Sequence, residues 1–392
     1  MHRIGTAERR ARLVERHRLA PGTRADGLAD VARSVLGIHS SDPITVFLAG
    51  RARLSRPDVG AMERELYEVR TVLRMHGMRR TLFVVPDDVA PVIQAGAAGR
   101  IAVAERVRVL REIDQAGLAA DPVAWLADVE DATLAALRAR GEATANQLGE
   151  DEPRLRTQML FNVGKKYEGS VGVSTRLLFL LAMEGRVARG RPAGSWVSSQ
   201  YRWIPIEAVL PDGYPPIDPP AARGEIVRRW LAAFGPGTVA DIRWYTGWTL
   251  GEVRRILAEL DVVEVDLDGT AGLVLADDEG STPAREPAAA FLPGLDPTVM
   301  GWLDRRFFLG GHAKLLFDTN GNAGPTVWWD GRIVGGWAQR RDGEVVHRLL
   351  EDVGADGAAA IELERDRLQS WLGPARVTPR FRTLFERELA GG

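Results

Sequence analysis

The stretch GPGTVADIRWYTGWTLGEVRRILAELDVVEVDLDGTAGLVLA, residues 235–276, decides the fold. Residues 235–238 lead into a helical segment over residues 239–245, and Thr249 is expected to cap a second helix over residues 250–260. We therefore expect two short helices here. Residues 262–265 and 273–276 then alternate as two strands. Two helices across a tight turn, followed by a strand pair, are typical of a winged helix-turn-helix.

The same order of elements occurs earlier in the chain. Thr144 caps a short helix after a glycine, Ser174 is expected to cap a helix over residues 175–184, and two strands follow around a glycine turn. Nearer the N-terminus, residues 6–20 form a basic helix, and Asp26 is expected to cap a helix that ends at a glycine. The chain therefore contains up to three helix-turn-helix units at irregular spacing.

We expect an α+β, mainly helical chain of tandem winged helix-turn-helix units with a strand-rich C-terminal region. The expected domains are residues 1–120, which include the candidate catalytic loop, 121–215, 216–280 and 288–392. A polar, proline-rich linker precedes the last domain. In that domain we expect strands at residues 290–292, 314–317, 325–329, 332–337 and 344–348, a hairpin turn at Asp330-Gly331, and helices at residues 359–371 and 379–389.

Composition excludes several classes of protein. The chain has 45% hydrophobic and 27% charged residues, which are ordinary globular values. No window is apolar enough for a transmembrane helix, and the first residues lack the apolar region of a signal peptide, so we expect a cytoplasmic protein that does not enter membranes. There is no cysteine. The six histidines have no metal-ligand spacing, so we expect no metal and no cofactor.

Charge is distributed unevenly along the chain. Residues 1–118 carry 20 arginines against 14 acidic residues, although the whole chain has a net charge of −2. A basic face on a neutral protein is consistent with nucleic-acid binding, and chance in an arginine-rich sequence explains it equally well. The only lysines are Lys165, Lys166 and Lys314, so a Schiff-base mechanism has few candidates.

One junction between two expected helices carries chemically capable residues. Gly37 ends the first helix, and Asp42-Pro43 begins the next as N-cap and first helical residue. His39, Ser40 and Ser41 lie between them. The side chains at this junction are therefore presented by a short segment that two helices hold in place.

Five segments resemble the AlkZ/YcaQ-like winged-helix DNA glycosylase family, in the same order and over nearly the whole chain. They are VLGIHSSDP (35–43), MRRTL (78–82), FGPGT (234–238) with Asp241 and Trp244, LPGLDP (292–297) with Asp304-Arg305, and GPTV (324–327) with Asp330-Gly331-Arg332, Val334 and Gly335.

The resemblance implies a monomer whose tandem winged helices form a concave channel around double-stranded DNA that carries alkylated bases. It implies a monofunctional DNA glycosylase, a hydrolase that excises cationic N7- or N3-alkylated purines in base excision repair. Its substrates include bulky genotoxin adducts or crosslinks, as in antibiotic self-resistance. The family's catalytic element is Gln-x-Gln or Gln-x-Asp, and that position reads His39-Ser40-Ser41 here. Phe83 stands where relatives often carry histidine.

His39 and Ser41 are nevertheless competent for this reaction. A cationic purine leaves without protonation, so the enzyme must place a water molecule against C1′ and stabilise the positive charge of the sugar. Histidine orients water and also accepts its proton, whereas glutamine only orients it. Ser41 supplies a further hydrogen bond. The ordinary alternatives are a junction histidine bound to backbone and a serine in a turn.

Asp42 is a candidate accessory residue that stabilises the sugar cation, although capping its helix is the simpler role. The candidate DNA-binding residues are Arg79, Arg80, Lys165, Lys166, Arg189 and Arg202. Each is suited to a phosphate contact, and each is equally explained as a solvated charge. The alternative function is a non-catalytic winged-helix regulator or lesion sensor, because both catalytic amide positions are changed.

Overall fold

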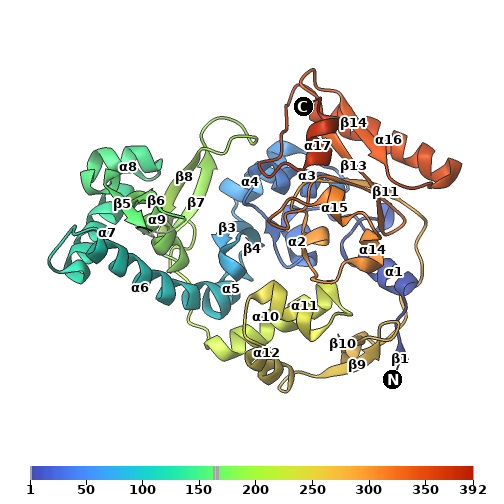
Figure 1. Ribbon diagram of the computed structural model, residues 1–392, viewed down its shortest axis with the longest axis horizontal. Coiled ribbons are helices and arrows are strands. Elements are labelled where there is room, and N and C mark those ends of the chain that lie inside the picture. The colour runs from blue at the N-terminus through green and yellow to red at the C-terminus, as the bar shows by residue number, and fades with distance from the viewer. Residues whose placement is uncertain (1, 162–163, 165–166, 392) are drawn as a thin grey trace. The chain divides into compact units, whose positions relative to one another are not determined.

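The computed structural model describes residues 2–161, 164 and 167–391 (Figure 1). The chain forms two compact units. Unit 1 comprises Met1–Val72, Phe83–Pro86 and Gly224–Gly392, and unit 2 comprises Leu73–Leu82 and Asp87–Arg223. The chain is α+β and mostly helical, as expected. Unit 1 joins both ends of the sequence, which no local pattern indicates, and the four expected domains stay a prediction.

The N-terminal part of unit 1 is mainly helical and carries the junction around His39. Its elements are β1 (His2–Arg3), α1 (Thr6–Arg16), α2 (Leu28–Ser34), β2 (Ile38–His39), α3 (Pro43–Arg53) and α4 (Val59–Tyr67). Strand β4 (Leu82–Pro86) joins them after the first short segment of unit 2. The expected helix–loop–helix junction therefore contains a two-residue strand, and β2 pairs antiparallel with β4.

The expected cap of α2 is wrong. The N-cap residue is Gly27, which has no side chain to cap the helix. Asp26 instead accepts a hydrogen bond from the Ser55 hydroxyl at 2.9 Å. The free N–H groups of Leu28 and Ala29 donate to the Glu65 carboxylate at 2.7 and 3.1 Å. Glu65 thus accepts the hydrogen bonds at the start of α2 that we expected Asp26 to accept.

Helix α3 is buried along its whole length, and a set of fully buried polar groups anchors it. Arg53, in its last turn, forms an ion pair with Asp296 at 2.6 Å, and both side chains are 0% exposed. Arg53 also donates to the Thr298 hydroxyl at 2.8 Å. Near the other end, the Thr45 hydroxyl donates to the Gly294 carbonyl at 2.8 Å. These contacts fix the helix that begins immediately after the candidate catalytic residues.

The stretch that decides the fold follows α10 (Pro219–Phe234) and forms the expected helices and strands. They are α11 (Val239–Thr246), α12 (Leu250–Leu257), β9 (Val262–Asp266) and β10 (Ala271–Leu275). Thr238 and Thr249 cap α11 and α12, each within a capping box. Strands β9 and β10 pair antiparallel, and β1 joins β9 in parallel. This is the element order that a winged helix requires.

The C-terminal part of unit 1 contains a four-stranded sheet in the order β11-β12-β13-β14. Its elements are β11 (Ala289–Leu292), α13 (Pro297–Met300), α14 (Arg306–Leu309), α15 (Ala313–Leu316), β12 (Thr326–Trp329), β13 (Arg332–Gln339), β14 (Val345–Leu349), α16 (Gly354–Leu372) and α17 (Leu384–Leu389). Asp330 and Gly331, both at positive φ, make the expected hairpin turn. Helix α16 packs on β11 and β14 (Figure 1).

Two expectations for this region are wrong. Residues 314–317 are not a strand, because α15 closes a helical turn in which the Phe317 N–H donates to the Ala313 carbonyl at 3.1 Å. Four apolar residues do not distinguish a strand from a helical turn. Residues 379–383 are not helical, and α17 begins only after Thr383, which caps it. The segment before Thr383 contacts the candidate catalytic loop instead.

Unit 2 consists of helices and two antiparallel strand pairs. Its elements are β3 (Val72–His76), η2 (Met78–Arg80), α5 (Ala90–Ile93), the π-helical η3 (Gln94–Ala98), α6 (Gly99–Gln115), α7 (Pro122–Arg140), α8 (Ala145–Asp151), β5 (Gln158–Phe161), β6 (Gly169–Gly172), α9 (Val173–Met183), β7 (Val187–Pro192) and β8 (Tyr201–Pro205). Its core is aliphatic, and Leu134, Leu177 and Leu181 are almost fully buried in it.

Thr144 caps α8 within a capping box, as expected. The expected cap at Ser174 is wrong: α9 begins one residue earlier, with Gly172 as its N-cap. The Val173 N–H donates to the Thr157 carbonyl at 2.9 Å, so backbone pairing sets this helix start. In the described part of the chain, no helix is long and apolar enough to cross a membrane.

Candidate functional site

A tight backbone turn precedes the candidate catalytic residues. Leu36 and Gly37 both have positive φ, 48° and 100°. The Gly37 N–H donates to the Ala32 carbonyl at 2.8 Å and so closes the end of α2. A Cβ atom at position 37 would lie 3.0 Å from the Val85 side chain. Only glycine meets both the dihedral angle and the close approach of β4.

The strained residue of this turn is held by a tyrosine from α11. The Tyr245 hydroxyl donates to the Leu36 carbonyl at 3.3 Å. Burial raises the pKa of Tyr245, so its hydroxyl stays protonated and remains a donor. The helix-turn-helix that decides the fold therefore also supports the turn that presents His39.

His39 lies opposite Phe83 in the β2–β4 pair. Their ring centroids are 5.7 Å apart in an edge-on arrangement. His39 and Phe83, two of the positions at which this chain differs from the pattern of the family it resembles, are thus direct cross-strand neighbours. An aromatic ring limits the orientations of the imidazole without supplying a polar atom that competes for its nitrogens.

The side chains of His39, Ser40 and Ser41 alternate in exposure. His39 and Ser41 are half-buried, whereas Ser40 is 0% exposed. His39 ends β2, and Ser41 lies in the bend that precedes α3. Both sequence candidates are therefore partly accessible to solvent, and Ser40 is buried between them. Within the described residues, the Ser40 hydroxyl has no hydrogen-bond partner.

Asp42 caps α3, and this simpler role is confirmed. One carboxylate oxygen accepts from the Ile44 N–H at 3.3 Å, and the other accepts from the Arg380 N–H at 2.8 Å. The side chain is buried, and desolvation raises the pKa of Asp42, although the backbone hydrogen bonds oppose that shift. Both oxygens are committed to backbone donors. The accessory role in catalysis stays a prediction.

Arg380 is the residue near this site that sequence reasoning missed. Besides its N–H contact with Asp42, its guanidinium donates to the Ser41 carbonyl at 3.2 Å. The two positions are 339 residues apart, and we expected a helix across the segment. The proline immediately before Arg380 was a local signal that this segment is not a helix interior.

The candidate DNA-binding arginines of unit 2 have different environments. Arg80 forms an ion pair with Glu105 at 2.6 Å, and Arg202 forms one with Glu142 at 2.7 Å. Arg189 stacks over the Trp203 ring at 3.8 Å. Arg79 is exposed, although desolvation by the surrounding protein lowers the pKa of its guanidinium. Lys165 and Lys166 lie outside the described residues.

No group of three or more histidine and carboxylate side chains is placed to hold a metal ion among the residues that the structure describes. The site offers a partly exposed imidazole and a partly exposed hydroxyl two residues apart, and Asp42 and Arg380 fix the adjoining backbone. This arrangement is suited to orienting a water molecule and removing its proton.

Comparison with known proteins agrees with this fold. A family model described as DNA glycosylase AlkZ-like matches residues 32–371. Among solved structures, the chain is similar to the Streptomyces sahachiroi DNA glycosylase AlkZ, with a TM-score of 0.71 and 19% identity over 97% of this chain and 100% of that one. A search of curated proteins finds no match. Because the family model covers most of the sequence, the chain belongs to the AlkZ-like DNA glycosylase family.

Proposed function

We propose that this protein is a monofunctional DNA glycosylase that hydrolyses the N-glycosidic bond of cationic N7- or N3-alkylated purines in double-stranded DNA. The observation that carries the proposal is that His39 and Ser41 are both partly exposed in the short segment between α2 and α3, in a member of a glycosylase family. Bulky genotoxin adducts and crosslinks are the substrates of interest for repair or self-resistance. We expect the winged helices to bind the duplex.

In the proposed reaction, the C1′–N9 bond breaks, and its electron pair neutralises the positive charge of the alkylated purine. A water molecule, oriented by His39 and Ser41, forms the new bond to C1′. Its proton passes to the neutral His39 imidazole. The products are an abasic site and a free alkylated base. The reaction requires no protonation of the leaving group and no cofactor.

The experiment measures base release from a duplex that carries N7-methylguanine, and then from one with a bulky N7 adduct. We expect His39→Ala to lower the rate by about 10²- to 10⁴-fold. Ser40→Ala is the matched control: it removes a hydroxyl from the same segment, on the buried face, and leaves the rate near that of the wild type. Release at the uncatalysed rate by the wild-type protein on both substrates would refute the proposal.

A pH profile tests the role of the imidazole. A histidine base must be neutral to accept a proton, so the wild-type rate falls below about pH 6. His39→Gln substitutes an amide that orients water without accepting a proton, and its slower rate is expected to be flat with pH. Tight binding of adducted DNA that stays intact in single-turnover assays would favour the non-catalytic lesion sensor instead.

A further inference from the structure

A cavity of about 250 Å³ opens in unit 1 beside the turn that joins β13 to β14. Guanidinium groups dominate its lining, which includes Gln339, Arg340, Arg341, Arg376, Thr378 and Arg382. No carboxylate lines it among the described residues. Four arginines around one small cavity, without a facing acid, are suited to an anion.

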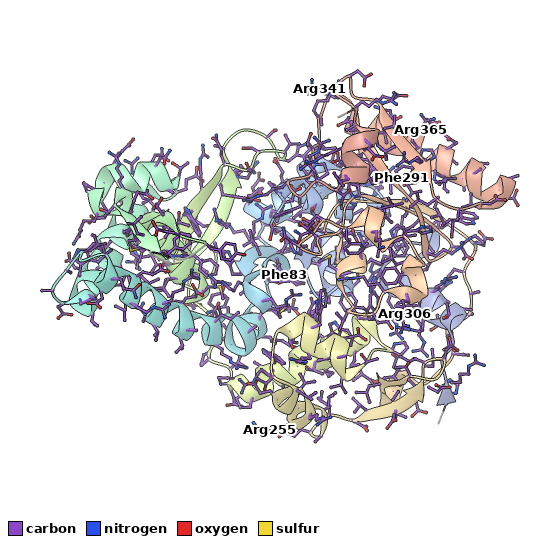
Figure 2. All side chains as sticks on the ribbon, viewed as in Figure 1. Phe83, Arg255, Phe291, Arg306, Arg341 and Arg365 are labelled. Carbon is purple, nitrogen blue, oxygen red and sulfur yellow. The ribbon has the colours of Figure 1, made fainter. Side chains whose placement is uncertain are left out.

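Two of these arginines are neutralised. Arg340 pairs with Glu344 at 2.6 Å, and Arg382 pairs with Glu386 at 2.7 Å. Arg376 binds only backbone carbonyls, including that of Asp342 at 2.8 Å, so its charge remains uncompensated. Arg341 makes no hydrogen bond or ion pair within the described residues. Figure 2 shows Arg341 at the outer end of the β13–β14 turn.

Arg380 links the cavity to the candidate catalytic loop, because it contacts Ser41 and lies in the sequence between two residues that line the cavity. Arg380 lies two residues after Thr378 and two before Arg382, both of which line the cavity. Arg380 is exposed and uses one of its five N–H donors on the Ser41 carbonyl. Two extended residues span at most about 7 Å, so Arg380 lies close to the cavity lining.

We propose that Arg341, Arg376 and Arg380, here called the phosphate clamp, bind consecutive backbone phosphates of the strand whose base is excised. Arg380 takes the phosphate next to the damaged nucleotide, because it contacts the backbone of Ser41. Arg341 and Arg376 take the phosphate that follows. The proposal rests on duplex DNA being the substrate, as in the proposed function. The clamp reads no sequence; it sets where the strand lies relative to His39.

Binding of the full-length protein to a fluorescent duplex, measured over a range of salt concentrations, tests the clamp. Arg380→Gln and Arg341→Gln each weaken binding severalfold, equally on damaged and undamaged duplex. Each also lowers the slope of log affinity against log salt by about 1. Arg365→Gln is the matched control: Arg365 lies on α16 of the same unit (Figure 2), and Glu362 and Asp366 already neutralise it. It leaves the slope unchanged.

Arg341→Gln separates the loss of a phosphate contact from a disturbance of the candidate catalytic loop. Arg380→Gln removes a contact with Ser41 and so also affects the loop, whereas Arg341 has no described partner whose loss could affect the fold. If both variants bind duplex with wild-type affinity and slope, the clamp is overturned. Inorganic phosphate, compared with chloride at equal ionic strength, separates the sources of the anion. One outcome is that phosphate raises the Tm of the wild type but not of Arg341→Gln, while the variant binds duplex as the wild type does. That outcome assigns the cavity to a free anion and overturns the clamp.

Failure of the clamp and failure of the proposed function are distinguishable. Binding is measured without any base release. If Arg341→Gln weakens binding and the wild-type protein never releases base, the clamp is supported and the proposed glycosylase activity is refuted. If the wild-type protein releases base and both variants bind duplex normally, the glycosylase activity is supported and the clamp is refuted.

Discussion

The ion pair that anchors α3 in unit 1 is buried on both sides, whereas the arginines paired around α6 and β8 in unit 2 reach solvent. Arg53 and Asp296 are each 0% exposed. In unit 2, Arg106 is 35% exposed and its partner Glu130 5%, and Arg202 is 37% exposed and its partner Glu142 44%. Buried charge in unit 1 therefore fixes the position of the candidate catalytic loop. In unit 2, Arg106 and Arg202 remain accessible to solvent.

The difference follows from what each pair would lose alone. A buried guanidinium without its carboxylate is left uncompensated in a medium that solvates it poorly. An exposed guanidinium is solvated by water with or without its partner. The predictions below set a change in one unit against a similar change in the other.

The largest effect is expected from Asp296→Asn in unit 1. The substitution keeps the shape of the side chain and strands the Arg53 charge, so the free energy of unfolding falls by about 3–5 kcal/mol. Glu142→Gln in unit 2 breaks an exposed pair and costs less than about 1 kcal/mol. Urea unfolding of both variants measures the difference. Equal costs would show that burial of the pair is not what matters.

Acid is expected to destabilise both units through one buried histidine each. Burial lowers the pKa of His17 in unit 1 and of His76 in unit 2 to about 3, from an ordinary value of 6.5. Both histidines are neutral in the folded protein, and the unfolded chain binds the extra protons. The stability they contribute is complete above pH 6.5 and is lost as the pH falls towards 3, by about 1.4 kcal/mol per pH unit for each.

Their surroundings explain these shifts. The His17 ring is fully buried, with the Thr298 hydroxyl at 2.8 Å and the Ala233 carbonyl at 3.1 Å. Desolvation lowers its pKa most, and the nearby Arg53 charge lowers it further. His76 packs edge-on against Phe179 at 4.9 Å, and Arg80 and Arg189 lower its pKa further. Urea midpoints at pH 7 and pH 5 test the prediction. His17→Gln and His76→Gln should each flatten the pH dependence, and an unchanged slope in both would contradict it.

Gly37→Ala is expected to destabilise the protein by about 1–3 kcal/mol, because alanine is strained at this φ and its Cβ meets Val85. Gly141 in unit 2 also has positive φ, 75°, but open space surrounds it. Gly141→Ala therefore costs only the dihedral strain, about 1 kcal/mol. Thermal unfolding ranks the two. Base release should fall in Gly37→Ala alone, and an equal fall in both variants would remove the special role of the turn.

The smallest effect is expected from Tyr245→Phe, which removes the hydrogen bond to Leu36 and costs about 1 kcal/mol. Thr133→Val is its counterpart in unit 2, where a buried hydroxyl donates to the Val129 carbonyl at 2.7 Å. The two variants should lose similar stability. Only Tyr245→Phe should slow base release, because only Tyr245 supports the turn before His39. If Thr133→Val slows base release as much, the support is not specific to that turn.

Local sequence determined much of the secondary structure. The caps at Thr144 and Thr249, the turn at Asp330-Gly331 and the cap at Asp42 formed as expected, because each depends on a side chain and backbone groups within a few residues. The matched segments also gave the family correctly. His39 and Ser41 were chosen as candidates because they lie between two helices and because the resemblance aligns them with the family's catalytic element, and their role stays a prediction.

Only the tertiary structure decided what supports that position. The cap of α2 comes from Glu65 rather than from Asp26, the turn is held by Tyr245, and Arg380 binds the loop from the other end of the chain. The two-unit division, in which the N- and C-terminal residues share a unit, has the same origin. These contacts join residues far apart in the chain. Periodicity and capping describe neighbours within a turn or two of backbone, so they carry no information about such contacts.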